Sequence, residues 1–301
     1  MTFITPSENA NAKVIENRGT GKQIFNQALN ALKQDTRVLL VPVIAFLVNI
    51  VLFAVIGVSW ILLIPAMSIY NSTNTINYVL GALLYILFAC THVFSQAIIM
   101  SAANDIFEGK KADLSAATKS AFSRFGSLFL FAIIESTVGL ILRTIADNLK
   151  GVAGALVRII GGLAWAVASY FAIPGILFDG LGPFKSIGQS GRLIKAKWGN
   201  VMRTNIAAGA VIALLMLAGF GAIFGGVFAF VTANSGTIDT INWNVGAILL
   251  FALGIGLVLF AGLLQGAILA FLKVALYRFA KGKSSAEFDS SLLNASFKLK
   301  N

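Results

Sequence analysis

The chain has 301 residues, of which 57% are hydrophobic and only 12% are charged, and its formal net charge is +11. A soluble globular domain carries about twice that charged fraction, so the composition excludes an ordinary soluble protein. Long apolar runs interrupt the positive charge and leave no continuous basic face, which excludes a nucleic-acid partner. Cys90 is the only cysteine, which excludes a disulfide within one chain and a metal site built from cysteine pairs.

Basic residues are concentrated in polar stretches that alternate with apolar segments. All Lys and Arg residues except Arg143, Lys150 and Arg158 lie in four such stretches, and two long apolar segments separate each stretch from the next. The stretches are residues 1–37, 110–124, 185–203 and 273–300. Basic residues stay on the cytoplasmic side of a membrane because translocating them is costly. The spacing therefore predicts a multi-pass protein of the cell membrane with both termini in the cytoplasm.

The apolar segments are long enough to cross a bilayer, which needs about 20 residues per helix. They predict six transmembrane helices at about residues 38–67, 78–101, 125–145, 152–178, 204–233 and 245–277. The chain then divides into a cytoplasmic segment (1–37), a transmembrane domain (38–277) and a cytoplasmic tail (278–301). We therefore expect an all-α integral membrane protein.

A polar segment with helical periodicity precedes the first, third and fifth spans. In each, apolar residues recur three and four positions apart, and polar residues occupy the other faces. The stripes are Ile24, Phe25, Ala28, Leu29 and Leu32; Leu114, Ala117, Ala121, Phe122 and Phe125; and Phe184, Ile187, Gly191, Ile194, Trp198 and Val201. Asp113 is placed to cap the second segment, and Pro183 to begin the third. We expect three amphipathic helices in the cytoplasmic interface. The alternative is that the segments are merely cytoplasmic loops and extensions of the spanning helices, since an ordinary packed helix also shows a short apolar stripe.

One stretch of the chain carries a more specific motif. An apolar helix ends at a proline and an acidic residue, a second proline opens a helix containing Ser, and a basic stretch with Trp-Gly leads into the next span. The residues are 173–179, 182–190 and 193–199. This motif resembles a pattern in uncharacterised bacterial six-helix membrane-protein families, domains of unknown function, and is similar to the membrane domain attached to some glycerophosphodiester phosphodiesterases. The resemblance implies a six-helix membrane protein of unassigned activity. It implies no phosphodiesterase activity, because this sequence shows no soluble phosphodiesterase domain.

Ionisable residues inside a bilayer are costly unless they are paired or hydrated, so those within the spans are functional candidates. Glu135 lies near the middle of the third span, and Arg158 of the fourth span is expected at a similar depth. His92 and Gln96 share one face of the second span, and Arg143 follows Glu135 by about two turns. These residues predict an intramembrane polar site for a lipid headgroup, a solute or a proton. The alternative is a buried pair of Glu135 and Arg158 that fixes the helix register, with hydrogen bonds from His92 and Gln96 across a packed interface.

Glycines in the last two spans predict close helix packing. Gly221 with Gly225, and Gly262 with Gly266, have the small-xxx-small spacing that lets helix backbones approach each other in lipid. In the fourth span, the Pro174-Gly175 pair is expected either to break the helix, a device that transporters use to expose backbone to a ligand, or simply to end it.

The sequence offers no recognisable active site. With one histidine, one cysteine and a single acid at mid-membrane, neither an oriented nucleophile nor a metal site can be assembled, so we expect no enzyme, metal or cofactor. Two functions remain. The first is a structural or regulatory membrane protein that organises anionic inner-leaflet lipids or partner proteins. The second is a small permease or lipid transporter, acting as a homo-oligomer, that uses the polar site around Glu135 and Arg158.

Overall fold

The computed structural model describes residues 26, 28–68, 73–149, 151–197, 201–234 and 244–282. Within these ranges the chain is helical and contains no strand. Six helical segments are long and apolar enough to cross a membrane, as the sequence predicts: Thr36–Leu62, Asn77–Phe107, Phe125–Asn148, Gly151–Asp179, Ile212–Asn234 and Val245–Arg278. Even the shortest, of 23 residues, exceeds the hydrocarbon core of about 30 Å at about 1.5 Å per residue.

Four of the spans are single helices and two are composite. The single helices are α3 (Thr73–Phe107), α5 (Phe125–Asn148), α10 (Val201–Asn234) and α11 (Val245–Ala280). The first span joins a 3₁₀ turn, η1 (Thr36–Leu39), to α2 (Leu40–Ser68). The fourth consists of α6 (Gly151–Leu156), a π-helical turn η2 (Val157–Gly161), α7 (Gly162–Ser169) and α8 (Ala172–Asp179). Two shorter helices, α4 (Leu114–Ser123) and α9 (Pro183–Lys197), precede α5 and α10.

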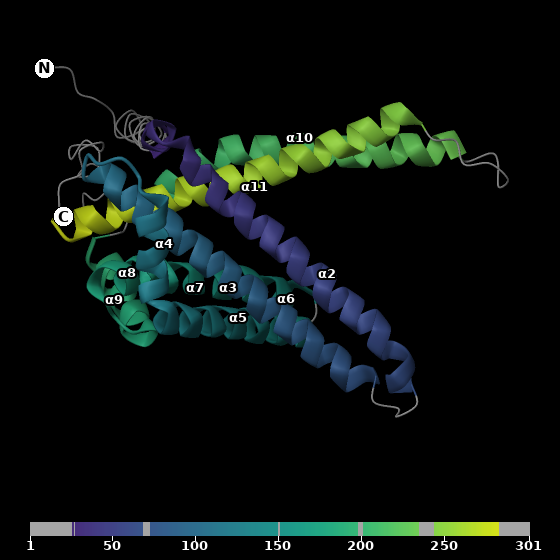
Figure 1. The fold of residues 1–301 in the computed structure, drawn as a ribbon, viewed down its shortest axis with the longest axis horizontal. Coiled ribbons are helices and arrows are strands. Elements are labelled where there is room, and N and C mark those ends of the chain that lie inside the picture. The colour runs from purple at the N-terminus through teal and green to yellow at the C-terminus, as the bar shows by residue number, and fades with distance from the viewer. Residues whose placement is uncertain are drawn as a thin grey trace, which may run out of the picture.

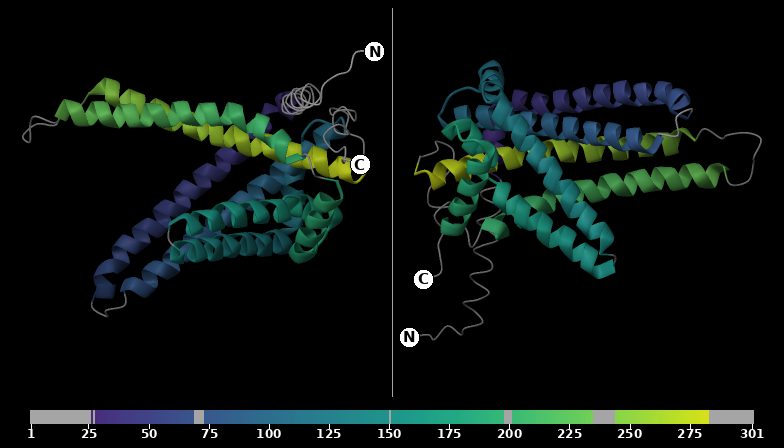
Figure 2. Two further views of the ribbon diagram at one scale, coloured as in Figure 1. Left: turned by 180° about the vertical axis from the view of Figure 1, so that it is seen from behind. Right: turned by 90° about the horizontal axis from the view of Figure 1, so that it is seen from below.

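The long helices converge at one end of the molecule and diverge toward the other (Figures 1 and 2). The α10–α11 hairpin separates from α2 and α3 with distance from the shared end, so that the molecule has the outline of a V. We call the shared end the base and define it as residues 28–39, 104–124, 172–197 and 270–282. It contains α4, α8 and α9 together with the ends of α3 and α11.

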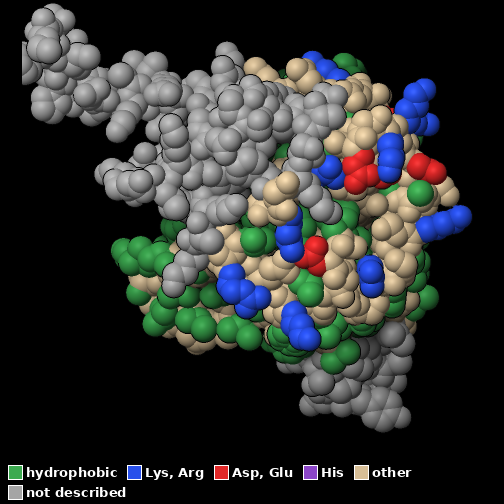
Figure 3. Space-filling view, turned by 90° about the vertical axis from the view of Figure 1, so that its left-hand side faces the viewer, with side chains coloured by type: hydrophobic (Ala, Val, Ile, Leu, Met, Phe, Trp, Pro, Cys, Tyr) green, Lys and Arg blue, Asp and Glu red, His purple; other side chains and the backbone are tan. Residues whose placement is uncertain are grey.

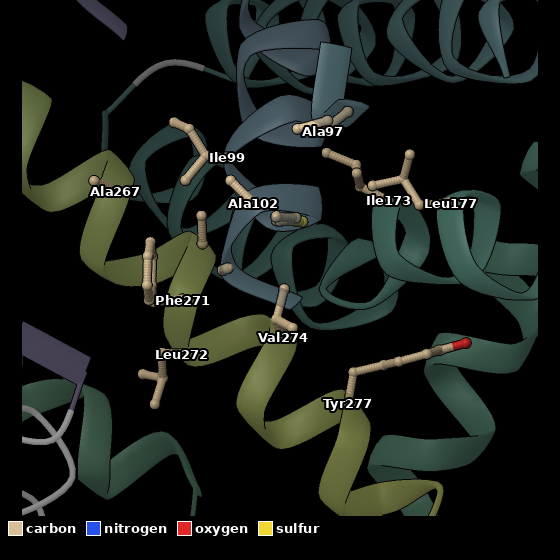
Figure 4. Close-up of a cluster of buried hydrophobic side chains, with 14 of the residues drawn as sticks. Ala97, Ile99, Ala102, Ile173, Leu177, Ala267, Phe271, Leu272, Val274 and Tyr277 are labelled. Atoms are coloured by element: carbon tan, nitrogen blue, oxygen red, sulfur yellow. The ribbon is translucent and has the colours of Figure 1, made fainter. Parts of the chain in front are cut away.

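The buried core lies at and just above the base, where α3, α8 and α11 meet (Figure 4). Ile99 and Ala102 of α3 pack with Phe271 and Val274 of α11, and all four are fully buried. Away from the base, large apolar side chains lie on the surface: the exposed fraction is 72% for Leu62. An apolar surface of this extent suits contact with lipid acyl chains, and the packing that holds the hairpins together is therefore concentrated at one end.

Close glycine packing joins α10 to α11. A Cβ atom added to Gly254 would lie 2.6 Å from the backbone nitrogen of Ile223, and one added to Gly226 would lie 2.7 Å from that of Phe251. A Cβ atom at Gly219 would lie 3.1 Å from the carbonyl oxygen of Gly254. These approaches leave no room for a side chain, so glycine sets the distance between the two helices.

The glycines at the closest approach of α10 and α11 differ from the two pairs that the sequence predicts. The prediction for Gly221 is wrong, because a Cβ atom there would meet nothing within 4 Å. Two residues correspond to about 200° around a helix, which turns Gly221 away from the face that carries Gly219, whereas seven residues return to it. Gly225 and Gly262 face only the side chains of Leu250 and Met216 across the hairpin.

The segments predicted to be amphipathic are helical where the structure describes them. On α4, Asp113 accepts hydrogen bonds from the backbone N–H groups of Ser115 and Ala116, as predicted for its cap, and Ala117 and Ala121 are buried. The first segment is described from residue 28, with Ala28 and Leu32 buried; Ile24 and Phe25 lie outside the described residues.

The third predicted stripe differs from the buried face of α9. Ser186 and Ser190 are fully buried, and Ile187 and Ile194 pack against the core, whereas Phe184 is 70% exposed. The side chains of Trp198 and Val201 lie outside the described part. Each of the three segments thus buries at least part of its apolar face within the base.

Candidate functional site

The fourth span is interrupted just before the motif that the sequence singles out. α7 ends at Ser169 and α8 begins at Ala172, so the break falls at Tyr170 and Phe171. Pro174 explains it, because a proline ring clashes with the carbonyl group four residues earlier, here that of Tyr170. The span is thus interrupted a turn before Pro174-Gly175, as one of the two predictions has it, and it also ends soon after the pair, at Asp179, as the other has it.

Two buried serines of α9 hold the interrupted helix in place. The backbone N–H of Phe171, freed at the break, donates a hydrogen bond of 2.9 Å to Ser190 Oγ. Ser186 Oγ donates to the carbonyl oxygen of Ala172 at 2.5 Å. Gly175 makes the approach possible, since a Cβ atom there would lie only 2.3 Å from Ser186 Oγ. The motif's proline, glycine and serines therefore dock α9 onto α8.

Asp179, the acidic residue of the motif, ties this pair of helices to α11. Its Oδ2 accepts hydrogen bonds from Tyr277 Oη at 2.7 Å, Gln189 Nε2 at 2.9 Å and Lys281 Nζ at 2.5 Å. Gly180, in the left-handed conformation with φ of 65°, ends α8 immediately after it. The proline, glycine, serines and aspartate of the motif thus hold α8, α9 and α11 together at the base.

Arg158 does not pair with Glu135, contrary to the sequence prediction. Its guanidinium group donates to Asp147, which lies at the C-terminal end of α5, and Arg143 contacts the same carboxylate at 3.7 Å. Because α5 and α6 are joined by a short turn, Asp147 is the nearest acid for a long side chain that reaches toward that end. All three side chains are at least half exposed. Arg143 and Arg158, two of the basic residues outside the four polar stretches, therefore share one carboxylate.

Glu135 has a different cationic neighbour, Lys273 of α11. The ammonium group of Lys273 acts electrostatically on Glu135 of α5 and on His92 of α3. The three ionisable side chains therefore lie near one another, although they come from three different helices. No ion pair within 4.0 Å joins Glu135 to any residue that the structure describes. The Lys273 ammonium lies 5.3 Å from the centre of the Tyr170 ring, at the break in the fourth span. The intramembrane polar group is therefore Glu135, His92, Lys273 and Tyr170.

The sequence analysis assigns Lys273 to the basic tail and therefore does not include it among the polar residues of the spans. Its position could have indicated otherwise, because it lies four residues before the predicted end of the sixth span, and a lysine within a span is a functional candidate. Gln96, which was predicted, does not join the group: it is buried and donates to the carbonyl oxygen of Gly266 at 3.5 Å. Gly266 thereby takes part in packing α11 against α3, and not against α10. His92 is exposed on the same helix.

At the base, Glu108 is the centre of a charged cluster between α3 and α11. Its carboxylate accepts hydrogen bonds from Lys110 Nζ at 2.8 Å and from Arg278 Nη1 at 3.1 Å, and Asn104 donates to it at 3.1 Å. The Lys110 ammonium, followed by Arg278 and Asn104, holds the pKa of Glu108 at about 2 against an ordinary value of 4.5. Ionised Glu108 is therefore part of the folded base.

The lowered pKa of Glu108 predicts acid sensitivity. A carboxylate with a depressed pKa in the folded state stabilises the fold at pH values above its ordinary pKa, and this contribution is lost as the pH falls toward 2. Thermal unfolding in detergent should show declining stability between about pH 5 and pH 2, and Glu108→Gln should start lower at pH 7 and fall less steeply. Parallel decline in the variant and the wild type would contradict this role.

Two hollows open on the base, and both are lined by basic side chains. The first, which we call the α9 groove, has a volume of about 380 Å³ and is lined by Leu181, Phe184, Lys185, Gly188, Gln189 and Arg192. The second, the α3–α4 pocket, has a volume of about 400 Å³ and is lined by Gln34, Asp35, Arg37, Ile106, Gly109, Lys110, Lys111 and Ala112. A third cavity, of about 220 Å³, is apolar and lies between α10 and α11. Of these three hollows, the two with charged side chains in their lining are thus the two at the base.

Together, the six long apolar helices define a polytopic helical membrane protein. Comparison with known proteins places it further: residues 75–287 match a family of unknown function, DUF6159, and the chain belongs to that family. No curated protein and no solved structure matches the chain. These comparisons give no link to the membrane domain of glycerophosphodiester phosphodiesterases. Among the described residues, no group of three or more His, Cys, Asp and Glu side chains could hold a metal ion.

Proposed function

We propose that this membrane protein has a structural, non-enzymatic role, in which the base lies at the cytoplasmic face of the cell membrane and organises anionic lipids of the inner leaflet. The observation that carries the proposal is the lining of the two hollows of the base, each of which presents Lys and Arg side chains. Figure 3 faces the base and shows Lys and Arg spread over it, with fewer Asp and Glu between them. Each such cation near the headgroups is worth about 1 kcal/mol.

The packing of the base supports the same role. α4 and α9 are held against the ends of the long helices by buried residues such as Ala117, Ala121, Ser186 and Ser190, and their charged residues Lys119, Lys185 and Arg192 are exposed. A rigid basic surface loses less conformational freedom on binding than a flexible loop would. The apolar helices extending from this surface lie where acyl chains would surround them.

The test is the composition of lipid that remains with the protein. The full chain would be extracted from its membrane in polymer-bounded lipid discs, and the anionic fraction of the retained lipid compared with that of the bulk membrane. We expect enrichment of anionic lipid, and loss of that enrichment when Lys111, Lys185 and Arg192, which are exposed and line the two hollows, are all replaced by Gln. Retained lipid with the bulk composition would contradict the proposal.

A second candidate, passage of a solute or proton, rests on the intramembrane polar group. Three ionisable residues from three helices, next to an interrupted span, resemble in arrangement the sites that transporters build at broken helices. Glu135→Gln in reconstituted vesicles separates the two. Under the second candidate, a pH-dependent flux present in the wild type disappears; under a structural role, no flux exists in either and only stability changes.

A further inference from the structure

The α9 groove has the shape and charge of a specific lipid site, and not merely of a basic patch. α9 is fixed in rotation about its axis, because Ser186 and Ser190 are both fully buried and hydrogen-bonded to the start of α8. The opposite face of the helix is therefore held outward. Lys185, Gly188 and Arg192 lie on that face, and all three are exposed.

Lys185 and Arg192 are placed to share one anion. Seven residues apart, they lie on the same side of the helix and about 10 Å apart along its axis, which two long side chains can span from both ends. None of the residues that line the groove is acidic. A phosphate group between them would accept hydrogen bonds from both cations, with the guanidinium group able to bind two of its oxygens.

Gly188 leaves the floor between the two cations open. A Cβ atom added to this glycine would meet nothing within 4 Å, and its backbone has ordinary helical geometry, so neither packing nor conformation requires glycine there. The absence of a side chain at Gly188 leaves space at the centre of the groove. A larger side chain at position 188 would occupy the volume in which a phosphate group would sit.

An apolar edge adjoins the two cations. Phe184 is 70% exposed and Leu181 is partly exposed, and both line the groove. A large exposed aromatic ring beside paired cations suits a ligand that carries a phosphate at one end and an acyl chain at the other. Free phosphate would use only the cations and leave the apolar edge unmatched.

We propose that the α9 groove is a binding site for one anionic phospholipid, with the phosphate held by Lys185 and Arg192 over Gly188 and the adjacent acyl chain against Phe184 and Leu181. The site rests on the proposed function, since it needs the base at a membrane surface. Gln189 forms one wall and donates to Asp179, which also accepts from Tyr277. The headgroup site is thereby connected to the end of α11.

The test uses the purified full chain and native mass spectrometry, with phosphatidylglycerol and phosphatidylcholine titrated separately. We expect Lys185→Gln with Arg192→Gln to weaken phosphatidylglycerol binding about 30-fold, about five-fold for each cation. Gly188→Leu should weaken it to a similar degree with no change of charge. The matched control, Lys33→Gln with Lys119→Gln, removes the same charge from exposed positions outside both hollows and should change binding less than about three-fold.

The possible outcomes distinguish a failure of the proposed lipid site from a failure of the proposed function. Equal weakening by both charge pairs, with no effect of Gly188→Leu, would overturn the site and leave general attraction to anionic lipid intact. Equal binding of both lipids by the wild type would overturn the proposed function as well. Displacement of phosphatidylglycerol by an equal concentration of inorganic phosphate would show a free-phosphate site and overturn the lipid assignment.

Discussion

Replacing Gly254 with leucine will separate the α10–α11 hairpin and destabilise the protein by about 3 kcal/mol, at the upper end of ordinary overpacking costs. The reason is that the new Cβ atom would lie 2.6 Å from the backbone nitrogen of Ile223 and 2.7 Å from the carbonyl oxygen of Gly219. Backbone atoms of a helix cannot rotate away as a side chain can, so the two helices themselves must move. Unfolding by a denaturing detergent, with the free energy compared to wild type, measures the effect.

Gly221→Leu is the matched control for this prediction. It makes the same chemical change on the neighbouring helix of the same hairpin, at a glycine that faces open space. A leucine there lies among acyl chains and should change stability by no more than about 0.5 kcal/mol. If the two variants are equally destabilised, glycine packing does not set the distance between α10 and α11.

The second large effect is a coupling between Gly175 and Ser186. Gly175→Ala should destabilise the protein by about 2 kcal/mol, because its new methyl group would lie 2.3 Å from Ser186 Oγ and the fully buried hydroxyl would lose its bond to Ala172. In a Ser186→Ala background the nearest remaining atoms would be 3.5 Å and 3.7 Å away, at ordinary contact. The same Gly175→Ala change should then cost less than about 0.5 kcal/mol.

This coupling is measured with the wild type, both single variants and the double variant in the same detergent unfolding assay. Gly188→Ala, on the outward face of α9, controls for the general effect of a methyl group on the helix and should be neutral or slightly stabilising. Strictly additive changes would mean that the docking of α9 onto α8 does not depend on the approach between these two residues.

The six spans were predictable because each is a long apolar run. Comparing the length of a run with the thickness of the bilayer identifies a span from its own residues alone, without knowledge of its neighbours. The break in the fourth span was predictable for the same reason, since Pro174 acts on its own helix through the carbonyl group of Tyr170. The pairing of polar residues could not be predicted in this way. Arg158 and Glu135 appeared matched in depth, yet Arg158 pairs with Asp147 across a short turn, and which acid it reaches depends on how the two helices lie beside each other.

The same limit explains the glycines and Lys273. Gly221 and Gly225 have the right spacing, but the rotation of each helix about its axis decides which glycines face the partner, and Gly219, Gly226 and Gly254 do. Lys273 was counted with the basic tail because a charge near a helix end usually reaches the interface. Its proximity to Glu135, His92 and Tyr170 on three other spans becomes visible only when the helices are packed.

The orientation of the base is tested most directly by cysteine labelling in right-side-out membrane vesicles. With Cys90 replaced by alanine, single cysteines would be introduced as Lys119→Cys at the base and Asn148→Cys at the opposite end of α5, both at exposed positions. A membrane-impermeant maleimide should label the Asn148→Cys variant in sealed vesicles, and the Lys119→Cys variant only after permeabilisation. Labelling of Lys119→Cys in sealed vesicles, with protection of Asn148→Cys, would place the base outside and contradict its role at the inner leaflet.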